Sequence, residues 1–83
     1  MSEQELRNAL LELCRAKPIM KEITADDDFF DYGASSLTIV DIQLDIEGQV
    51  GVSVDTTILM SQPTVNGWVE IYLGELARKE SAA

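Results

Sequence analysis

The sequence predicts an all-α fold, a small four-helix bundle with three long helices and one short helix. Apolar residues recur at spacings of three and four, and residues that cap helices stand before these segments. The only segment with strand-like alternation is too short to form a sheet. With 83 residues the chain is long enough for one domain. We expect this domain to span residues 1–83, with an ordered core at about residues 3–78.

The first helix is predicted to begin after Ser2, which forms a capping box with Glu5. It ends near Lys17, because Pro18 disfavours helical geometry in the residue before it. Cys14, the only cysteine, is expected to be a small core residue rather than a reactive thiol. The predicted core face consists of Leu6, Leu10 and Leu13, with Ala9 and Cys14 beside them.

Residues 18–35 form a long connection without helical periodicity. Three apolar residues, Ile19, Ile23 and Phe29, are expected to anchor it to the core. A connection of this length inside a compact domain is usually functional or packed by its own side chains.

The consecutive aspartates of this connection, Asp26, Asp27 and Asp28, do not form a calcium-binding loop. The EF-hand pattern requires glycine and glutamate at two later positions, which Asp31 and Leu37 occupy here. We expect the three carboxylates to be solvated turn formers, and we predict no metal site.

The second helix begins at Ser35 or Ser36, because serine is a preferred N-cap residue. Gly33 closes the connection before it. The helix is expected to run to about Gln49, and Gly51 then supplies a stop.

The last third of the sequence predicts an extended segment and two further helices. Val52 and Val54 lie in the extended segment, and residues 56–61 fit one short helical turn. Thr64 is predicted to cap the last helix. Residues 78–83 are expected to fray. The predicted core face of the last helix consists of Val65, Trp68, Val69, Tyr72 and Leu76.

The second helix carries two apolar stripes. The Ile39 stripe consists of Ile39, Ile42, Ile46 and Val50, and the Leu37 stripe consists of Leu37, Val40 and Leu44. A small bundle rarely buries both stripes of one helix. Either this helix is central and buried all round, or the Leu37 stripe faces outward and the Ile39 stripe packs in the core.

Carboxylates beside the Leu37 stripe favour its exposure as a partner surface, because an apolar strip with a polar rim is typical of interfaces. These carboxylates belong to Asp41, Asp45 and Glu47. The predicted partner-binding residues are Leu37, Val40, Asp41, Leu44 and Glu47.

Charge and composition exclude several classes of function. The net charge of −9 argues against binding to nucleic acid or to anionic membranes, and favours partners with basic patches. The acidity is also compatible with a role in solubility alone. No apolar run approaches the roughly 20 residues of a membrane span. The N-terminus lacks the pattern of a signal peptide, so we expect a cytoplasmic protein.

The segment from Asp31 to Leu37, AspTyrGlyAlaSerSerLeu, places a serine at a helix N-terminus. Backbone N–H groups and the helix dipole favour negative charge there, such as that of a phosphodiester. The segment partly matches the Gly-x-Ser-x-Gly elbow of hydrolases, but Leu37 replaces the last glycine. The chain also has no histidine to act as a base. We therefore expect no catalytic residues.

PhePheAspTyrGlyAlaSerSerLeu, residues 29–37, resembles the Phe-Phe-x-x-Gly-(Gly/Ala)-x-Ser-Leu signature of acyl and peptidyl carrier proteins. Val-Gly-Val at residues 50–52 and ProThrVal at residues 63–65 follow at spacings similar to peptidyl-carrier and polyketide-type domains. The resemblance covers about residues 5–76. One position departs from the pattern: Ser35 stands where the family usually has Asp or His, and it can cap the helix but carries no charge.

The resemblance implies an acyl-carrier-protein-like bundle with 4′-phosphopantetheine attached covalently to Ser36, the serine directly before leucine. The arm would hold acyl or aminoacyl groups as thioesters, so the chain would be a carrier and not an enzyme. Expected partners are a phosphopantetheinyl transferase, an acyl- or aminoacyl-loading enzyme, and ketosynthase, condensation or acyltransferase-type enzymes. The implied setting is a freestanding, monomeric carrier in polyketide or nonribosomal-peptide (antibiotic) biosynthesis.

Two alternatives remain open from the sequence. Besides a carrier, the chain could be an unmodified helical adaptor with a carrier-like fold, or an acidic interaction domain unrelated to carriers. Agreement of the serine motif, ProThrVal and the helix lengths favours the carrier.

Overall fold

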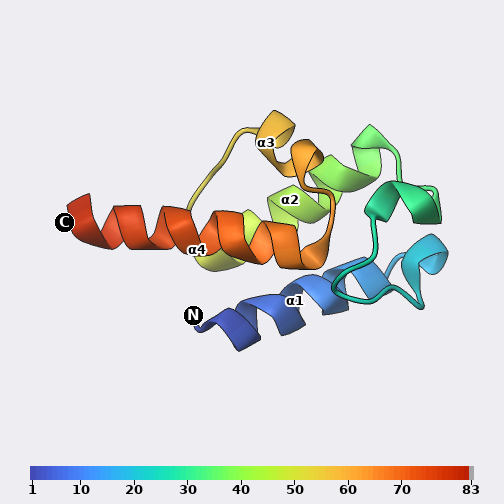
Figure 1. Ribbon diagram of the computed structural model, residues 1–83, viewed down its shortest axis with the longest axis horizontal. Helices are drawn as coiled ribbons and strands as arrows, with labels where there is room; N and C mark the ends of the chain where they lie inside the picture. The colour runs from blue at the N-terminus through green and yellow to red at the C-terminus, as the bar shows by residue number, and fades with distance from the viewer. Residues whose placement is uncertain (83) are drawn as a thin grey trace.

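The computed structural model describes residues 1–82, which contain four α-helices and two short 3₁₀ turns joined by loops (Figure 1). Within this part there is no strand, and none of its helices has the length and apolar character needed to cross a membrane. The prediction of three long helices and one short helix is confirmed. In chain order the elements are α1 (Glu3–Arg15), η1 (Pro18–Met20), η2 (Phe29–Tyr32), α2 (Ser36–Val50), α3 (Thr56–Ser61) and α4 (Val65–Ala82).

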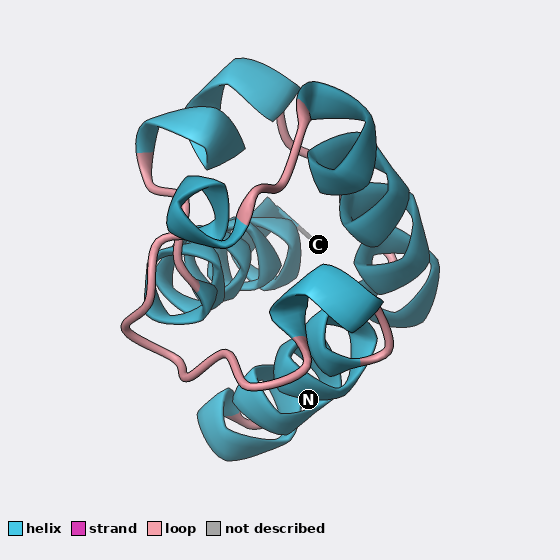
Figure 2. Ribbon diagram, turned by 90° about the vertical axis from the view of Figure 1, so that its right-hand side faces the viewer, coloured by secondary structure: helices cyan, strands magenta, loops and turns pink. Residues whose placement is uncertain are grey.

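The helices surround a shared interior, as the end-on view in Figure 2 shows. Both chain termini lie toward one end of the molecule, and the start of α2, green in Figure 1, lies toward the other. α1 packs against both α2 and α4, and α3 bridges α2 and α4. The start of α2 therefore lies at the end of the bundle away from the two termini.

α1 begins with the predicted capping box and ends slightly earlier than expected. The Glu5 amide donates to Ser2 Oγ (3.1 Å), and the Ser2 amide donates to Glu5 Oε1 (2.9 Å). The helix ends at Arg15 rather than near Lys17. Lys17 already has extended geometry (φ −85°, ψ 125°), as expected for the residue before Pro18.

Trp68 lies at the centre of the core and joins three elements. Its ring meets the edge of Phe29 (centroids 5.2 Å apart) and that of Tyr72 (6.4 Å), both in T-shaped arrangements. Its Nε1 donates to the Leu59 carbonyl (3.0 Å), so its one polar atom is satisfied. The buried apolar residues are Leu6, Leu10, Cys14, Met20, Ile23, Phe29, Ala34, Ile39, Ile42, Ile46, Leu59, Val65, Trp68, Val69 and Tyr72.

Three predicted core positions differ from the structure. Ile19 was expected to anchor the long connection, but it is 50% exposed, because the η1 turn directs Met20 into the core instead. Leu13 is only half-buried, since Cys14 takes the central place on α1. Leu76 is also half-buried, because it lies beyond the part of α4 that crosses the core.

The long connection is tied to the start of α4 by backbone hydrogen bonds. The Phe29 amide donates to the Pro63 carbonyl (2.8 Å), and the Asn66 amide donates to the Ala25 carbonyl (3.0 Å). The Asn66 side chain also donates to Asp26 (2.6 Å). These contacts fix the segment that delivers the chain to α2.

α4 is assigned as helix as far as Ala82, and Ala83 lies outside the described residues. The expected fraying of residues 78–83 stays a prediction. Near this end, Arg78 pairs with Glu75 within α4 (2.7 Å), and Lys79 donates to the Gly51 carbonyl at the end of α2 (3.0 Å). At the other end of α4, the Gly67 amide donates to Thr64 Oγ1 (2.9 Å), which confirms the predicted cap.

Two glycines near the end of α2 predict opposite responses to the same substitution. Gly48 lies inside the helix and a Cβ there meets nothing, so Gly48→Ala should raise the free energy of unfolding by about 1 kcal/mol. Gly51 ends the helix with φ +75°, a conformation that strains a residue with a Cβ. Gly51→Ala should therefore lower the free energy of unfolding by about 1 kcal/mol. Urea denaturation of both variants measures the difference, and a shift of both midpoints in one direction would contradict this account.

Candidate functional site

The turn before α2 is fixed by a glycine and a buried alanine. Gly33 ends η2 with φ 86°, in the left-handed region that glycine adopts without strain. Ala34 is buried, and its amide donates to the Phe29 carbonyl (3.2 Å). The chain is therefore anchored in the core directly before it presents Ser35 and Ser36.

Ser35 uses its side chain to cap α2. The Thr38 amide donates to Ser35 Oγ (3.4 Å), and the Ser35 amide donates back to Thr38 Oγ1 (3.4 Å). The two hydroxyl oxygens lie 3.3 Å apart. The predicted serine cap is thus Ser35, and its hydroxyl has a structural role.

Ser36 is the first residue of α2, and it is exposed. The side-chain hydrogen bonds at this helix start use the hydroxyl of Ser35 and not that of Ser36. A phosphate ester on Ser36 would therefore displace no side-chain contact there. It would also lie at the positive end of the helix dipole, beside amides of the first turn that have no helical acceptor. The residues present fit a phosphopantetheine group at Ser36.

The two stripes of α2 face opposite ways. Ile39, Ile42 and Ile46 are fully buried, and Val50 at the end of the stripe is half-buried. On the Leu37 stripe, Leu37 is 81% exposed and Leu44 is 65% exposed, and Val40 between them is half-buried. Asp41 and Asp45 are exposed on the same side. The helix is therefore not buried all round.

Glu47 does not belong to this outward face, which corrects its assignment to the partner surface. Its Oε2 accepts hydrogen bonds from the Tyr72 hydroxyl (3.0 Å), the Val54 amide (3.0 Å) and Gln43 Nε2 (3.1 Å). The carboxylate points inward because these three donors lie between α2, the segment before α3, and α4. Burial, and then the charge of Glu47, raises the pKa of Tyr72, so the tyrosine stays protonated as a donor.

Gln43 completes this Glu47 cluster and was missed by the sequence reasoning. It is buried, its Nε2 also donates to the Val54 carbonyl (2.9 Å), and its Oε1 accepts from Thr56 Oγ1 (2.6 Å). The sequence did contain a signal for this contact: Gln43 lies four positions before Glu47, beside the buried stripe, and side chains at this spacing on a helix are neighbours. The Glu47 cluster consists of Gln43, Glu47, Val54, Thr56 and Tyr72.

The aspartates of the long connection form turns. Asp27 accepts from the Thr24 amide (2.8 Å) and the Tyr32 hydroxyl (2.9 Å), and the Thr24 hydrogen bond is the main cause that lowers the Asp27 pKa. Asp28 caps η2 by accepting from the Phe30 amide (2.7 Å). Within residues 1–82, no group of carboxylate, cysteine or histidine side chains is arranged to hold a metal ion.

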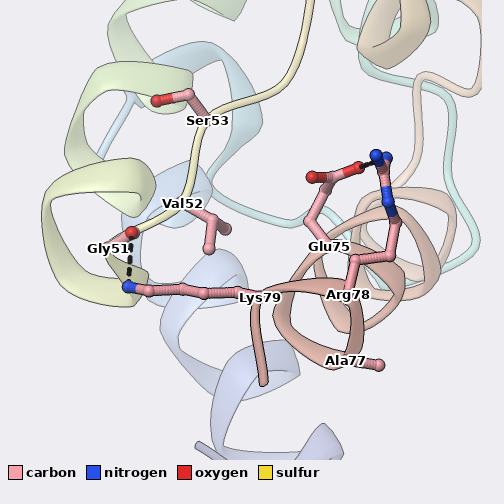
Figure 3. Close-up of a pocket in the computed structure, with 7 residues that line it drawn as sticks. All are labelled: Gly51, Val52, Ser53, Glu75, Ala77, Arg78 and Lys79. Carbon is pink, nitrogen blue, oxygen red and sulfur yellow. Dashed lines mark hydrogen bonds and ion pairs between the residues drawn. The ribbon is translucent and has the colours of Figure 1, made fainter. Parts of the chain in front are cut away.

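An open hollow lies between residues 51–53 and α4 (Figure 3). Its two cations are already engaged, Lys79 with the Gly51 carbonyl and Arg78 with Glu75. It lies at the C-terminal end of α2, about 20 Å along the helix from Ser36 at 1.5 Å per residue. This hollow is therefore separate from the candidate attachment site.

One of three comparisons with known proteins gave a match. The sequence profile of a family described as "Phosphopantetheine attachment site" matches residues 4–71. This span includes α1 except its first residue, all of α2 and α3, and the first part of α4. Neither the search of curated proteins nor the search of solved structures gave a match.

The Glu47 cluster predicts that Glu47 contributes to stability and that its neighbour Asp45 does not. Glu47→Ala leaves the Tyr72 hydroxyl and the Val54 amide without their acceptor, and should lower the free energy of unfolding by about 2 kcal/mol. Asp45→Ala removes the same charge from an exposed position and should change it by less than about 0.5 kcal/mol. Equal urea midpoints for the two variants would contradict the inward role of Glu47.

Cys14 is predicted to be unreactive in the folded protein. It is fully buried, and burial raises the pKa of its thiol to about 12, so thiolate is scarce at neutral pH. A chromogenic disulfide reagent should detect no thiol in the native protein before the arm is attached, and one thiol after denaturation. Rapid labelling under native conditions would show that α1 opens locally.

Proposed function

We propose, because the chain belongs to the phosphopantetheine attachment family, that it is a carrier protein whose attachment residue is Ser36. Members of this family carry covalently attached 4′-phosphopantetheine. The observation that supports Ser36 is the division of roles at the start of α2. Ser35 caps the helix, and Ser36 presents an exposed hydroxyl.

The chain itself positions and presents the attachment point. The buried Ile39 stripe fixes the rotation of α2, and Gly33 with Ala34 fixes the turn that leads into it. Ser36 is thereby held at the rim of the bundle. When bound, the arm supplies a terminal thiol that holds an acyl or aminoacyl group as a thioester. The chain acts in this proposal as a substrate-bearing partner of enzymes and not as an enzyme.

The outward face of α2 is the proposed docking surface for these enzymes. It joins the exposed side chains of Leu37 and Leu44 to the carboxylates of Asp41 and Asp45, beside Ser36. With a net charge of −9, the chain favours partners that present lysine or arginine around an apolar patch. A shuttle must be released after each transfer, so we expect a small, weak and salt-sensitive contact.

The proposed partners are a phosphopantetheinyl transferase, an acyl- or aminoacyl-loading enzyme, and condensing or acyltransferase-type enzymes. A polyketide or nonribosomal-peptide setting is supported by the spacing from the serine motif to ProThrVal at residues 63–65.

The attachment proposal is tested by intact-protein mass after incubation with coenzyme A and a broad-specificity phosphopantetheinyl transferase. The parent and Ser35→Ala should each gain one phosphopantetheine, and Ser36→Ala should gain none. Ser35→Ala keeps the attachment residue and removes only the cap, so it should lose about 1 kcal/mol of stability.

A second readout uses the buried cysteine. Because Cys14 is inaccessible in the folded protein, a thiol that becomes reactive after the modification belongs to the arm. If the folded parent gained no mass, the chain would instead be an adaptor that kept the carrier fold without the arm.

A further inference from the structure

The docking face of α2 contains an internal ion pair. The ammonium of Lys17, which lies between α1 and η1, contacts the Asp41 carboxylate. Asp41 lies one turn after Leu37 and one turn before Leu44, so it occupies the middle of the exposed face. The chain thus places one of its own cations at the centre of the surface that we propose for basic partners.

We propose that Lys17 is a specificity-determining residue, which competes with the cations of partner enzymes for Asp41. The inference rests on the proposed carrier function, because it concerns the same docking face. A partner that places a lysine or arginine on Asp41 must displace the Lys17 ammonium. A partner without a cation at this position leaves the Lys17–Asp41 pair intact. Because Lys17 then neutralises Asp41, such a partner meets a less negative surface.

The backbone of Lys17 is anchored although its side chain is free to move away. The Lys17 amide donates to the Cys14 carbonyl (3.0 Å), and the Met20 amide donates to the Lys17 carbonyl (2.9 Å). Cys14 and Met20 are both fully buried. The backbone of Lys17 is therefore fixed within reach of Asp41, and the ion pair with Asp41 holds the ammonium on the face of α2.

Solvent exposure sets the strength of this competition. The Asp41 side chain is 53% exposed and that of Lys17 is 32% exposed, so water screens the pair. Exposed ion pairs change equilibria by a few-fold. The pair therefore biases the choice of partner and does not block docking, which suits a carrier that must bind several enzymes in turn.

Lys21 offers a matched control. It is exposed in the same connection, and within residues 1–82 it forms no ion pair with a carboxylate. Lys17→Met and Lys21→Met both change the net charge from −9 to −10, because each removes one positive charge. Only Lys17→Met releases Asp41, so a difference between the two variants isolates the ion pair from the general increase in negative charge.

The experiment measures kcat/KM for phosphopantetheine transfer from coenzyme A by a broad-specificity transferase with a basic docking face, at low ionic strength. Lys17→Met should react about two- to five-fold faster than Lys21→Met, and Asp41→Asn should react more slowly than the parent. In the Asp41→Asn background the two lysine variants should react equally fast. Added salt should reduce the advantage of Lys17→Met. Thermal unfolding checks that every variant is folded.

The outcomes separate this inference from the proposed function. If the parent is modified and Lys17→Met is no faster than Lys21→Met, the competition is refuted and the carrier proposal stands. An advantage of Lys17→Met that persists in the Asp41→Asn background, or an unchanged rate for Asp41→Asn alone, also refutes it. If the folded parent is not modified at all, both proposals fail.

Discussion

Burial of the Ile39 stripe is the constraint on which the other features of the molecule depend. Ile39, Ile42 and Ile46 are fully buried, and together they fix the rotation of α2 about its axis. Because successive helical residues turn by about 100°, this rotation decides which residues face outward. Leu37 and Leu44 are exposed for this reason, and the carboxylates of Asp41 and Asp45 accompany them.

The two ends of α2 are stabilised by different means, and the difference matches their roles. At the start, the Ser35 cap, the buried Ala34 and the buried Ile39 hold the helix and leave Ser36 exposed. The far end is bound on two sides, by the Glu47 cluster toward α3 and α4 and by Lys79 on the Gly51 carbonyl. A partner that binds near Ser36 therefore meets a helix whose opposite end is firmly attached to the bundle.

The features that could be predicted from the sequence are those that depend on residues close together in the chain. The capping box of Ser2, the stop at Gly51 and the short helix at residues 56–61 depend on neighbours within about one turn, and each was predicted correctly. Glu47 was misplaced because its donors include Tyr72, which lies 25 residues away in the sequence. The Lys17–Asp41 pair joins residues 24 positions apart, and it too follows from tertiary packing and not from periodicity.

The distribution of positive charge explains why one lysine can influence docking. The chain has 6 cationic side chains against 15 carboxylates, and within residues 1–82 most of the cations have internal acceptors. Arg7 pairs with Glu3, Arg78 with Glu75, and Arg15 donates to the Ile23 carbonyl. These pairs lie on α1, on α4 and on the long connection, away from the outward face of α2. Lys17 is the cation that contacts this face, so its removal changes the charge that a partner meets more than the loss of another cation would.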